Sequence, residues 1–472
     1  MSFASIHFIF IFLPVTLVAF YLQRKWKWRN SILVIASLVF FGWVDPSHFP
    51  LLLFSVLFNY FYGLIIGLFI ERGEKLSAKH HMWIAVIINI LILWFYKYLG
   101  FSLDIVHQIT HIQIDWQNQV LPLGISYFTF AGISYLLDIY FSVEKAERNL
   151  LRFSTYLVMF PKILQGPITR YGQVKNELVA TNMDSDEIMG GVQRLITGLA
   201  KKVLIADSLA IAANKVFDAN LNTIGAGVAW FGLIAYTLQI YFDFSGYTDM
   251  AVGLGKFFGF KLPENFNYPY ISRSVSDFWR RWHMSLTAWF RTYLFIPLEF
   301  ARKKEKHLRQ QSNILIVFAL TGLWHGASWN FLIWGGYFGL ILAIEASGFG
   351  KRLKKTPPIV QHIYALLLIM VGWVFFRLTD ITQWGTFFGA LVGANGWTGT
   401  TTLRTLNILF YFPIMIIAIF LCTPVLNNLI EKASAKTTFS RILIDVLYLI
   451  LFFLGIIYIL SNGFQAFLYG QF

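Results

Sequence analysis

The sequence predicts an all-α polytopic membrane protein with about 11–12 transmembrane helices plus re-entrant helices around a central funnel. Of its 472 residues, 57% are hydrophobic and 13% are charged, whereas soluble domains have about 45–50% apolar and about 25% charged residues. The mean hydropathy is +0.60. Apolar runs recur at close to the ~20 residues that a bilayer requires. Because no long hydrophilic block interrupts them, we expect a single membrane domain over residues 1–472.

The apolar runs predict the spans in chain order. The first run follows no basic region and precedes no small-residue cleavage site, so we interpret it as a span and not as a signal peptide. The single cysteine, Cys422, excludes an intrachain disulfide and is expected to be a core residue. The predicted spans are residues 6–22, 31–44, 51–70, 82–100, 120–141, 192–212, 226–242, 311–327, 329–348, 361–378, 407–426 and 442–461.

Lysine and arginine predict the orientation. Basic residues cluster in alternate loops, which marks those loops as cytoplasmic. The intervening loops 101–118 and 462–472 hold no lysine or arginine, so both termini are expected outside. This placement explains the formal charge of +14 by membrane topology, and we expect no nucleic-acid partner. The basic clusters are Arg24–Arg29, Arg302–Lys306 with Arg309, Lys351–Lys355, and Lys432 with Lys436 and Arg441.

Two stretches are too charged for lipid contact and too apolar for free loops. Residues 153–180 contain two prolines, two lysines and an arginine, and residues 264–300 mix four arginines with tryptophan and tyrosine. Irregular backbone at membrane depth survives only where protein or water satisfies its polar groups. We therefore predict re-entrant or cytoplasmic-face helices that line a funnel open to the cytoplasm.

His325 is the first candidate catalytic residue. A helix that starts near Asn313 and rises ~1.5 Å per residue places His325 roughly 18 Å into the bilayer. Ionisable groups at that depth usually mark functional sites. Trp329 follows at i+4, on the same face if the helix continues. The glycine pairs of this region, Gly322 with Gly326 and Gly335 with Gly339, have the small-xxx-small spacing of close helix packing.

A second histidine, His283, lies in an equally aromatic setting. Transfer of a group to a hydroxyl needs a base for the hydroxyl proton and a hydrogen-bond donor for the negative charge that develops. A buried neutral imidazole suits the first task, and His325 is the candidate. Side chains that suit the second are His283, Ser285, and Trp324 or Trp329. We expect no metal or bound cofactor, because no P-loop, dinucleotide fingerprint or Cys/His metal motif is present.

Charged residues near His283 suit a negatively charged donor. Arg280, Arg281 and Arg291, with Arg273, are expected to line the cytoplasmic mouth and contact the phosphates of a donor molecule. Asp243 and Asp249 are expected to pair with Arg280, Arg281 or Arg291 in a structural ion network.

Several long motifs occur in one order along the chain and resemble the membrane-bound O-acyltransferase family. The resemblance is nearest to the bacterial branch with the alginate O-acetyltransferase membrane subunit. It implies that His325 is catalytic and that His283 is a second active-site histidine. Where that pattern has Arg-Asp-Tyr, this chain has Arg291-Thr292-Tyr293, which removes an acidic side chain. The motifs are Leu121–Phe130, Tyr241–Met250, Phe278–Arg291, Tyr293–Pro297, Gly322–Ala327 and Phe467–Phe472.

The resemblance implies a multi-pass acyltransferase of the bacterial cytoplasmic (inner) membrane. We expect transfer of an acyl group, in our interpretation acetyl, from a cytoplasmic thioester donor (acetyl-CoA or acyl carrier protein) towards hydroxyls of an exported polysaccharide or cell-wall glycan. An extracytoplasmic partner related to SGNH hydrolases is expected to complete the transfer. D-alanyl transfer to teichoic acid is the alternative enzyme, and a glycan or small-molecule transporter is the alternative from another class. The donor, the polymer and the oligomeric state are left open.

Overall fold

The structure is a computed structural model that describes residues 2–23, 25–112, 114, 116–117, 119–180, 184–303, 309–434, 437–463 and 466–467. Helices dominate these ranges, and isolated β-bridges join Ile224 to Gly399 and Thr401. The predicted all-α fold class is confirmed. Of the predicted loops, Arg24, Asp115, residues 304–306 and Lys436 lie outside the described residues, as do residues 468–472 of the last motif.

The chain forms two compact units, residues 1–195 with 247–264 and residues 196–246 with 265–472. Helix α12 (Ala226–Phe257) contributes to both units. The expectation of one membrane domain over the whole chain stays a prediction.

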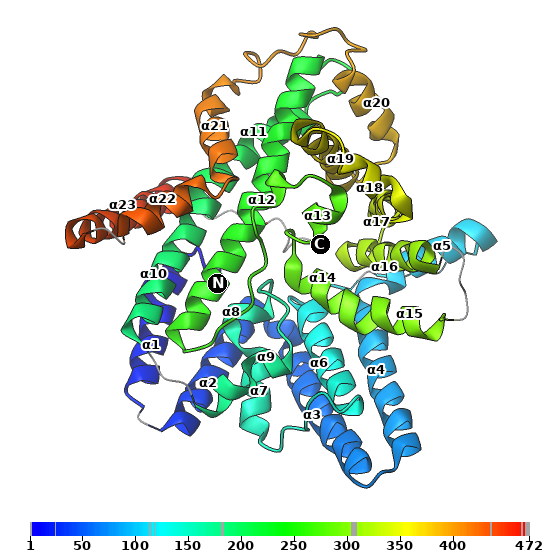
Figure 1. Cartoon of the computed structure of the whole chain (residues 1–472), viewed down its shortest axis with the longest axis vertical. Coiled ribbons are helices and arrows are strands. Elements are labelled where there is room, and N and C mark those ends of the chain that lie inside the picture. Colours follow the sequence, from blue (N-terminus) through cyan, green and yellow to red (C-terminus); the bar gives the residue numbers. More distant parts are fainter. Residues whose placement is uncertain are drawn as a thin grey trace. The chain divides into compact units, whose positions relative to one another are not determined.

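The first unit is a bundle in which α3, α4 and α6 pack against one another (Figure 1). Asn59 and Asn89 exchange amide hydrogen bonds between α3 and α4, at 3.0 and 3.3 Å. Polar side chains commonly join helices inside a membrane in this way. The elements up to α6 are η1 (Phe8–Phe12), α1 (Leu13–Tyr21), α2 (Trp26–Val44), η2 (Pro46–His48), α3 (Phe49–Glu71), α4 (Lys75–Lys97), α5 (Leu99–Thr110) and α6 (Ile125–Tyr140).

Residues 153–180 form short helices separated by breaks, in agreement with the prediction that this stretch is not a span. Pro161 opens one of these helices at a position where its missing N–H costs no hydrogen bond. Most of the stretch is buried in the protein. The elements are α7 (Leu150–Val158), α8 (Phe160–Ile163) and α9 (Tyr171–Val179), followed by α10 (Ser185–Ala200).

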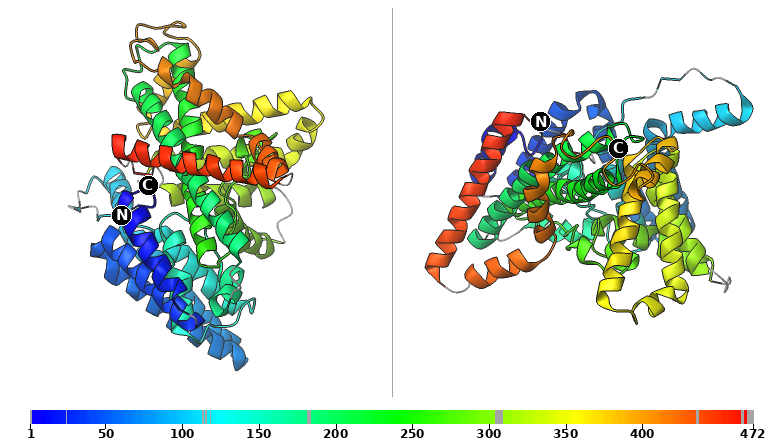
Figure 2. Two further views of the ribbon diagram at one scale, coloured as in Figure 1. Left: turned by 90° about the vertical axis from the view of Figure 1, so that its left-hand side faces the viewer. Right: turned by 90° about the horizontal axis from the view of Figure 1, so that it is seen from above.

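The second unit holds a large aromatic core around α12, α13, α17 and α19. In its C-terminal part, α22 and α23 lie next to each other (Figure 2). Residues 264–300 are again short helices, as predicted. The elements are η3 (Lys201–Ala206), α11 (Asp207–Phe217), η4 (Pro269–Ile271), α13 (Val275–Trp279), α14 (Met284–Phe290), η5 (Arg291–Phe295), α15 (Ile296–Ala301), α16 (Arg309–His325), α17 (Trp329–Ile344), η6 (Glu345–Phe349), α18 (Gly350–Leu353), α19 (Pro358–Arg377), α20 (Thr382–Leu391), η7 (Leu409–Tyr411), α21 (Phe412–Leu421), α22 (Val425–Ser434) and α23 (Thr438–Asn462).

Five helices within the described ranges are long and apolar enough to cross a membrane alone. A sixth candidate is the pair Leu409–Leu421 and Val425–Ser434, bent by 67°. Other predicted spans correspond to shorter apolar helices or are divided, as residues 192–212 are between α10, η3 and α11. The five are Pro46–Glu71, Lys75–Lys97, Trp329–Leu353, Pro358–Arg377 and Thr438–Ser461.

The helix does not continue through His325, in agreement with the two separate spans predicted at 311–327 and 329–348. Helix α16 ends at His325, and α17 begins at Trp329 after a three-residue turn, so Trp329 does not follow His325 on one helical face. The two helices then pack closely, as the glycine spacing predicted. A Cβ on Gly322 would lie 3.1 Å from the Cα of Gly335, so only glycine permits this approach.

The expected partners of Asp243 and Asp249 are also wrong. Asp243 pairs with Lys202 at 2.7 Å, and Lys202 also pairs with Asp207 at 2.7 Å. Asp249 pairs with Arg194 at 2.7 Å. Helix α12 thus directs these carboxylates towards the segment around residues 194–207 and not towards the arginines of 280–291. The expectation of structural ion pairs is correct, but the cations are different.

Candidate active site

His283 occupies a strained position immediately before α14. Its backbone has φ +45° and ψ +52°, in the left-handed region that residues other than glycine rarely adopt. Such conformations cost about 1–3 kcal/mol and persist only where the surrounding structure enforces them. The side chain is fully buried. The fold therefore fixes the direction of this imidazole.

Asn265 holds the imidazole from the segment that follows α12. Its side-chain oxygen accepts from Nδ1 of His283 at 3.1 Å and from the backbone N–H and hydroxyl of Ser285 at 3.1 and 2.9 Å. Its backbone carbonyl accepts from the N–H of Met284 at 2.9 Å. An amide oxygen only accepts hydrogen bonds, so Nδ1 must carry the hydrogen of His283, and Nε2 presents its lone pair.

The Nε2 atom of His283 is buried and has no hydrogen-bond partner among the described residues. Burial lowers the pKa of His283 to about 3, so the ring is neutral near pH 7. A neutral imidazole with an oriented lone pair can take a proton from a hydroxyl. In this tautomer His283 is suited to accept a hydrogen bond, whereas donation to an oxyanion would require the other tautomer.

Trp324 contacts both predicted catalytic histidines. Its ring centroid lies 5.7 Å from that of His283 and 4.9 Å from that of His325. Phe244 of α12 also contacts His283, with the two ring centroids 4.8 Å apart in T-shaped geometry. The tertiary structure therefore brings His283 and His325, 42 positions apart, to one aromatic side chain.

His325 is enclosed by aromatic rings at the end of α16. Besides Trp324 it contacts Trp334 of α17 at 5.0 Å and Phe376 of α19 at 5.4 Å, both in T-shaped geometry. Only 3% of its surface is exposed. Side chains of α16, α17 and α19 therefore meet at this imidazole.

Trp334 was not predicted as a site residue. Its indole is fully buried against His325, and its N–H has no hydrogen-bond partner among the described residues. Asn265 was missed as well. A signal for Asn265 existed, since it is a polar residue inside the aromatic stretch 264–300, but its partner lies 18 positions away. Trp334 is one of many tryptophans and carries no such signal.

The other predicted site residues differ in their distance from His283. Ser285 uses its hydroxyl on Asn265, and Trp329 is 42% exposed at the start of α17. Arg291 is exposed where η5 begins. The structure therefore brings Ser285, but neither Trp329 nor Arg291, into the hydrogen-bonded group around His283.

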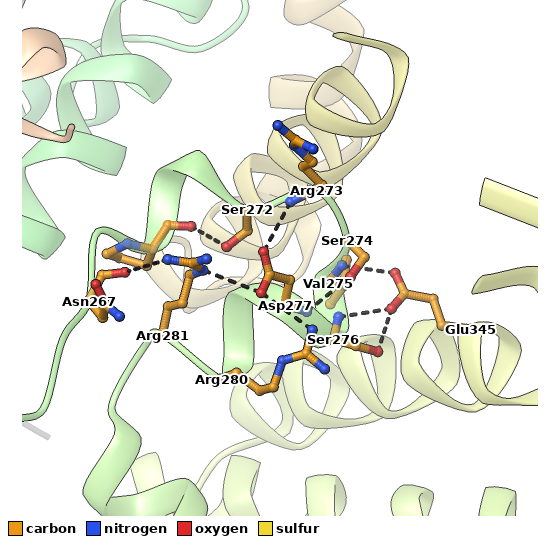
Figure 3. A network of polar contacts seen from close by, with 11 residues as sticks. Asn267, Ser272, Arg273, Ser274, Val275, Ser276, Asp277, Arg280, Arg281 and Glu345 are labelled. Carbon is orange, nitrogen blue, oxygen red and sulfur yellow. Dashed lines mark hydrogen bonds and ion pairs between the residues drawn. The ribbon is translucent and has the colours of Figure 1, made fainter. Parts of the chain in front are cut away.

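Arg280 and Arg281 belong to a polar network around α13 (Figure 3). Both guanidinium groups lie 3.3 Å from the carboxylate of Asp277. On the other side of the helix, Glu345 accepts from the backbone N–H groups of Val275 and Ser276 at 2.8 Å. This carboxylate satisfies the N–H groups at the start of α13 and so fixes the segment that leads to His283.

Comparison with known proteins identifies the family. Residues 142–379, which include both histidines, match the model of the membrane-bound O-acyltransferase family. The chain belongs to the membrane-bound O-acyltransferase family. It is therefore an O-acyltransferase, and the expectation drawn from the motifs is confirmed.

Relatives of this O-acyltransferase fall in three groups of named proteins. A probable alginate O-acetylase AlgI of Azotobacter vinelandii is 38% identical over 84% of this chain and 79% of its own length. The peptidoglycan O-acetyltransferase of Helicobacter pylori is 33% identical over 82% of this chain and 79% of its own length. The teichoic acid D-alanyltransferase of Bacillus subtilis is 34% identical over 67% of this chain and 80% of its own length. The three names refer to the O-acetylation of alginate, the O-acetylation of peptidoglycan and the D-alanylation of teichoic acid.

Proposed function

We propose that this O-acyltransferase moves an acetyl group from a cytoplasmic thioester donor towards hydroxyls of an exported polysaccharide or cell-wall glycan. An extracytoplasmic partner related to SGNH hydrolases completes the transfer to the polymer. The observation that carries the proposal is the meeting of two buried histidines on Trp324, within a chain whose relatives acylate such polymers.

In the proposed step the hydroxyl oxygen of the acceptor attacks the thioester carbonyl carbon. His325 takes the hydroxyl proton, the new C–O bond forms, and the C–S bond breaks. The thiolate leaves and receives the proton from His325, so the enzyme returns to its starting state. His283, held neutral by burial and oriented by Asn265, contributes its Nε2 lone pair to the proton path, and we assign the stabilisation of the oxyanion to the buried indole N–H of Trp334.

Acetyl is favoured over D-alanyl by the extent of similarity. The O-acetylating relatives align over 82% or more of this chain, whereas the D-alanyltransferase of Bacillus subtilis aligns over 67%. D-alanyl transfer remains the second candidate. Membership of an acyltransferase family argues against a transporter.

The test replaces His325 by alanine. We expect His325→Ala to insert and fold normally but to lose transfer by about 10²–10⁴-fold, because general-base catalysis is worth that much. The measurement is O-acetyl content of the polymer in cells, with radiolabelled acetate and radiolabelled D-alanine followed in parallel. His107→Ala, at an exposed histidine of α5, is the matched control. Near-normal acylation by His325→Ala would refute the role of His325, and labelling by D-alanine alone would refute acetyl transfer.

A further inference from the structure

A polar pocket lies in the second unit, away from the residues of the histidine site. Its volume is about 520 Å³, within the ~300–1,000 Å³ typical of small-molecule sites. One wall is the end of α11 with the turn after it, residues 217–222, and the other is the end of α19 with the start of α20, residues 377–386. The second wall continues beyond residue 379, where the match to the family ends.

The pocket wall presents groups that both donate and accept hydrogen bonds. The hydroxyls of Thr379 and Thr386 and the side-chain amide of Gln383 have no hydrogen-bond partner within the described part of the chain. The side-chain nitrogen of Asn220 is also available to a ligand, because it is the side-chain oxygen of this residue that accepts from the backbone N–H of Asn222. Amides and hydroxyls of this kind match sugar hydroxyls, which are donors and acceptors at once.

The charges of the pocket disfavour an anionic ligand. Two carboxylates, Asp218 and Asp380, face one guanidinium, Arg377. That guanidinium is already engaged, because it donates to Asn214 at 3.1 Å and pairs with Asp218 at 3.3 Å. A polyuronate or a phosphate polymer would therefore meet net negative charge, and like charges in contact repel.

An exposed tryptophan lies on the loop that braces the first wall. Asn395 donates to the carbonyl of Leu221 at 3.3 Å, and the carbonyl of Trp397 accepts from the N–H of Gly227 at 3.0 Å. The indole of Trp397 is 73% exposed. The loop that carries this exposed indole contacts the first wall through Asn395, and an exposed aromatic ring can stack against the apolar face of a sugar ring. By the predicted orientation both walls and this loop are extracytoplasmic.

We propose that this pocket binds a neutral, hydroxyl-rich sugar residue of the acceptor glycan on the extracytoplasmic side. By binding this sugar residue, the pocket keeps the polymer in contact with the enzyme during acyl transfer. This inference rests on the proposed function, and it narrows the acceptor to a glycan without a carboxylate or phosphate on the bound residue.

The experiment measures saccharide binding by the purified full-length protein in nanodiscs, by isothermal titration calorimetry. The probes are chitotetraose and cellotetraose, which are neutral, and a mannuronate tetramer of the same length. We expect a neutral tetramer to bind at least about tenfold tighter than the uronate. Gln383→Ala and Thr386→Val should each weaken binding about fivefold, as expected for one lost hydrogen bond. Gln310→Ala, at an exposed glutamine of α16, is the matched control.

Tighter binding of the uronate, or unchanged binding by both pocket variants, would overturn the inference. So would the absence of saccharide binding together with lower polymer acylation in the pocket variants, because that result would make the pocket a contact for a protein. The proposed function is tested separately, since His325→Ala should lose transfer and still bind the neutral tetramer. An active His325→Ala variant would therefore count against the catalytic assignment and leave the pocket untouched.

Discussion

Replacing Asn265 by alanine should remove the hydrogen bond that holds the imidazole of His283 in its orientation. The side-chain oxygen of Asn265 accepts three hydrogen bonds, one from His283 and two from Ser285. Each buried bond contributes about 0.5–1.5 kcal/mol, so the loss of all three should cost about 1.5–4.5 kcal/mol of folding stability. The imidazole also loses the bond that keeps the hydrogen on Nδ1, so we expect transfer to fall by more than the stability change explains.

A conservative replacement separates orientation from stability. Asn265→Asp keeps an acceptor for Nδ1, and its negative charge should raise the pKa of His283 from about 3. His283 contributes to the proton path only in its unprotonated form, so the acid limb of the pH–activity profile should move to higher pH in Asn265→Asp. A residue with a purely structural role would change the amount of folded protein without moving this limb.

The assay compares thermal unfolding in detergent with acyl transfer as a function of pH. The matched control is Asn267→Ala, at an exposed asparagine two residues away whose interaction with Arg281 uses the backbone carbonyl. We expect the control to resemble the wild type in both measurements. An Asn265→Ala variant with normal transfer, or an Asn265→Asp profile that coincides with the wild-type profile, would show that Asn265 does not position a catalytic His283.

Three further predictions concern topology, pH and packing. Single cysteines at Ser312 and Asn462 in a cysteine-free background should label from opposite faces; labelling from one face would contradict the predicted orientation. Because the pKa of His283 is lowered to about 3, the wild type should lose up to about 1.4 kcal/mol of stability per pH unit below pH 6.5 relative to His283→Ala; parallel stability curves would refute this. Gly335→Ala should destabilise by about 1–3 kcal/mol in thermal unfolding, because its Cβ meets a backbone carbonyl of α16, whereas Gly336→Ala, with open space around it, should not; equal melting temperatures would refute the close packing.

Some features of the fold and of the candidate site could be predicted from single segments of the chain. Composition and run length determine the membrane class, because they depend on local hydrophobicity and not on packing. The stretch 264–300 was recognised as short, partly buried helices because its charges and prolines are incompatible with lipid contact. His283 and His325 were found for a similar reason, since an ionisable residue in an aromatic, apolar setting stands out along the sequence.

Other features depend on which segments meet in space. Asn265 reaches His283 across 18 positions, and Trp334 reaches His325 from the following helix, a contact that the sequence pattern did not predict. The predicted cationic partners of Asp243 and Asp249 were wrong for the same reason. The sequence shows which residues are basic but not which of them packs against a given aspartate.

The sequence by itself therefore determined that this is an all-α membrane protein, and it predicted His283 and His325 as the catalytic residues. Only the tertiary structure decided that Trp324 joins them and that Asn265 leaves Nε2 of His283 as the acceptor. The physical reason is that hydrophobicity and charge act on each segment separately, whereas a tautomer is set by a hydrogen-bond partner that only packing brings within reach.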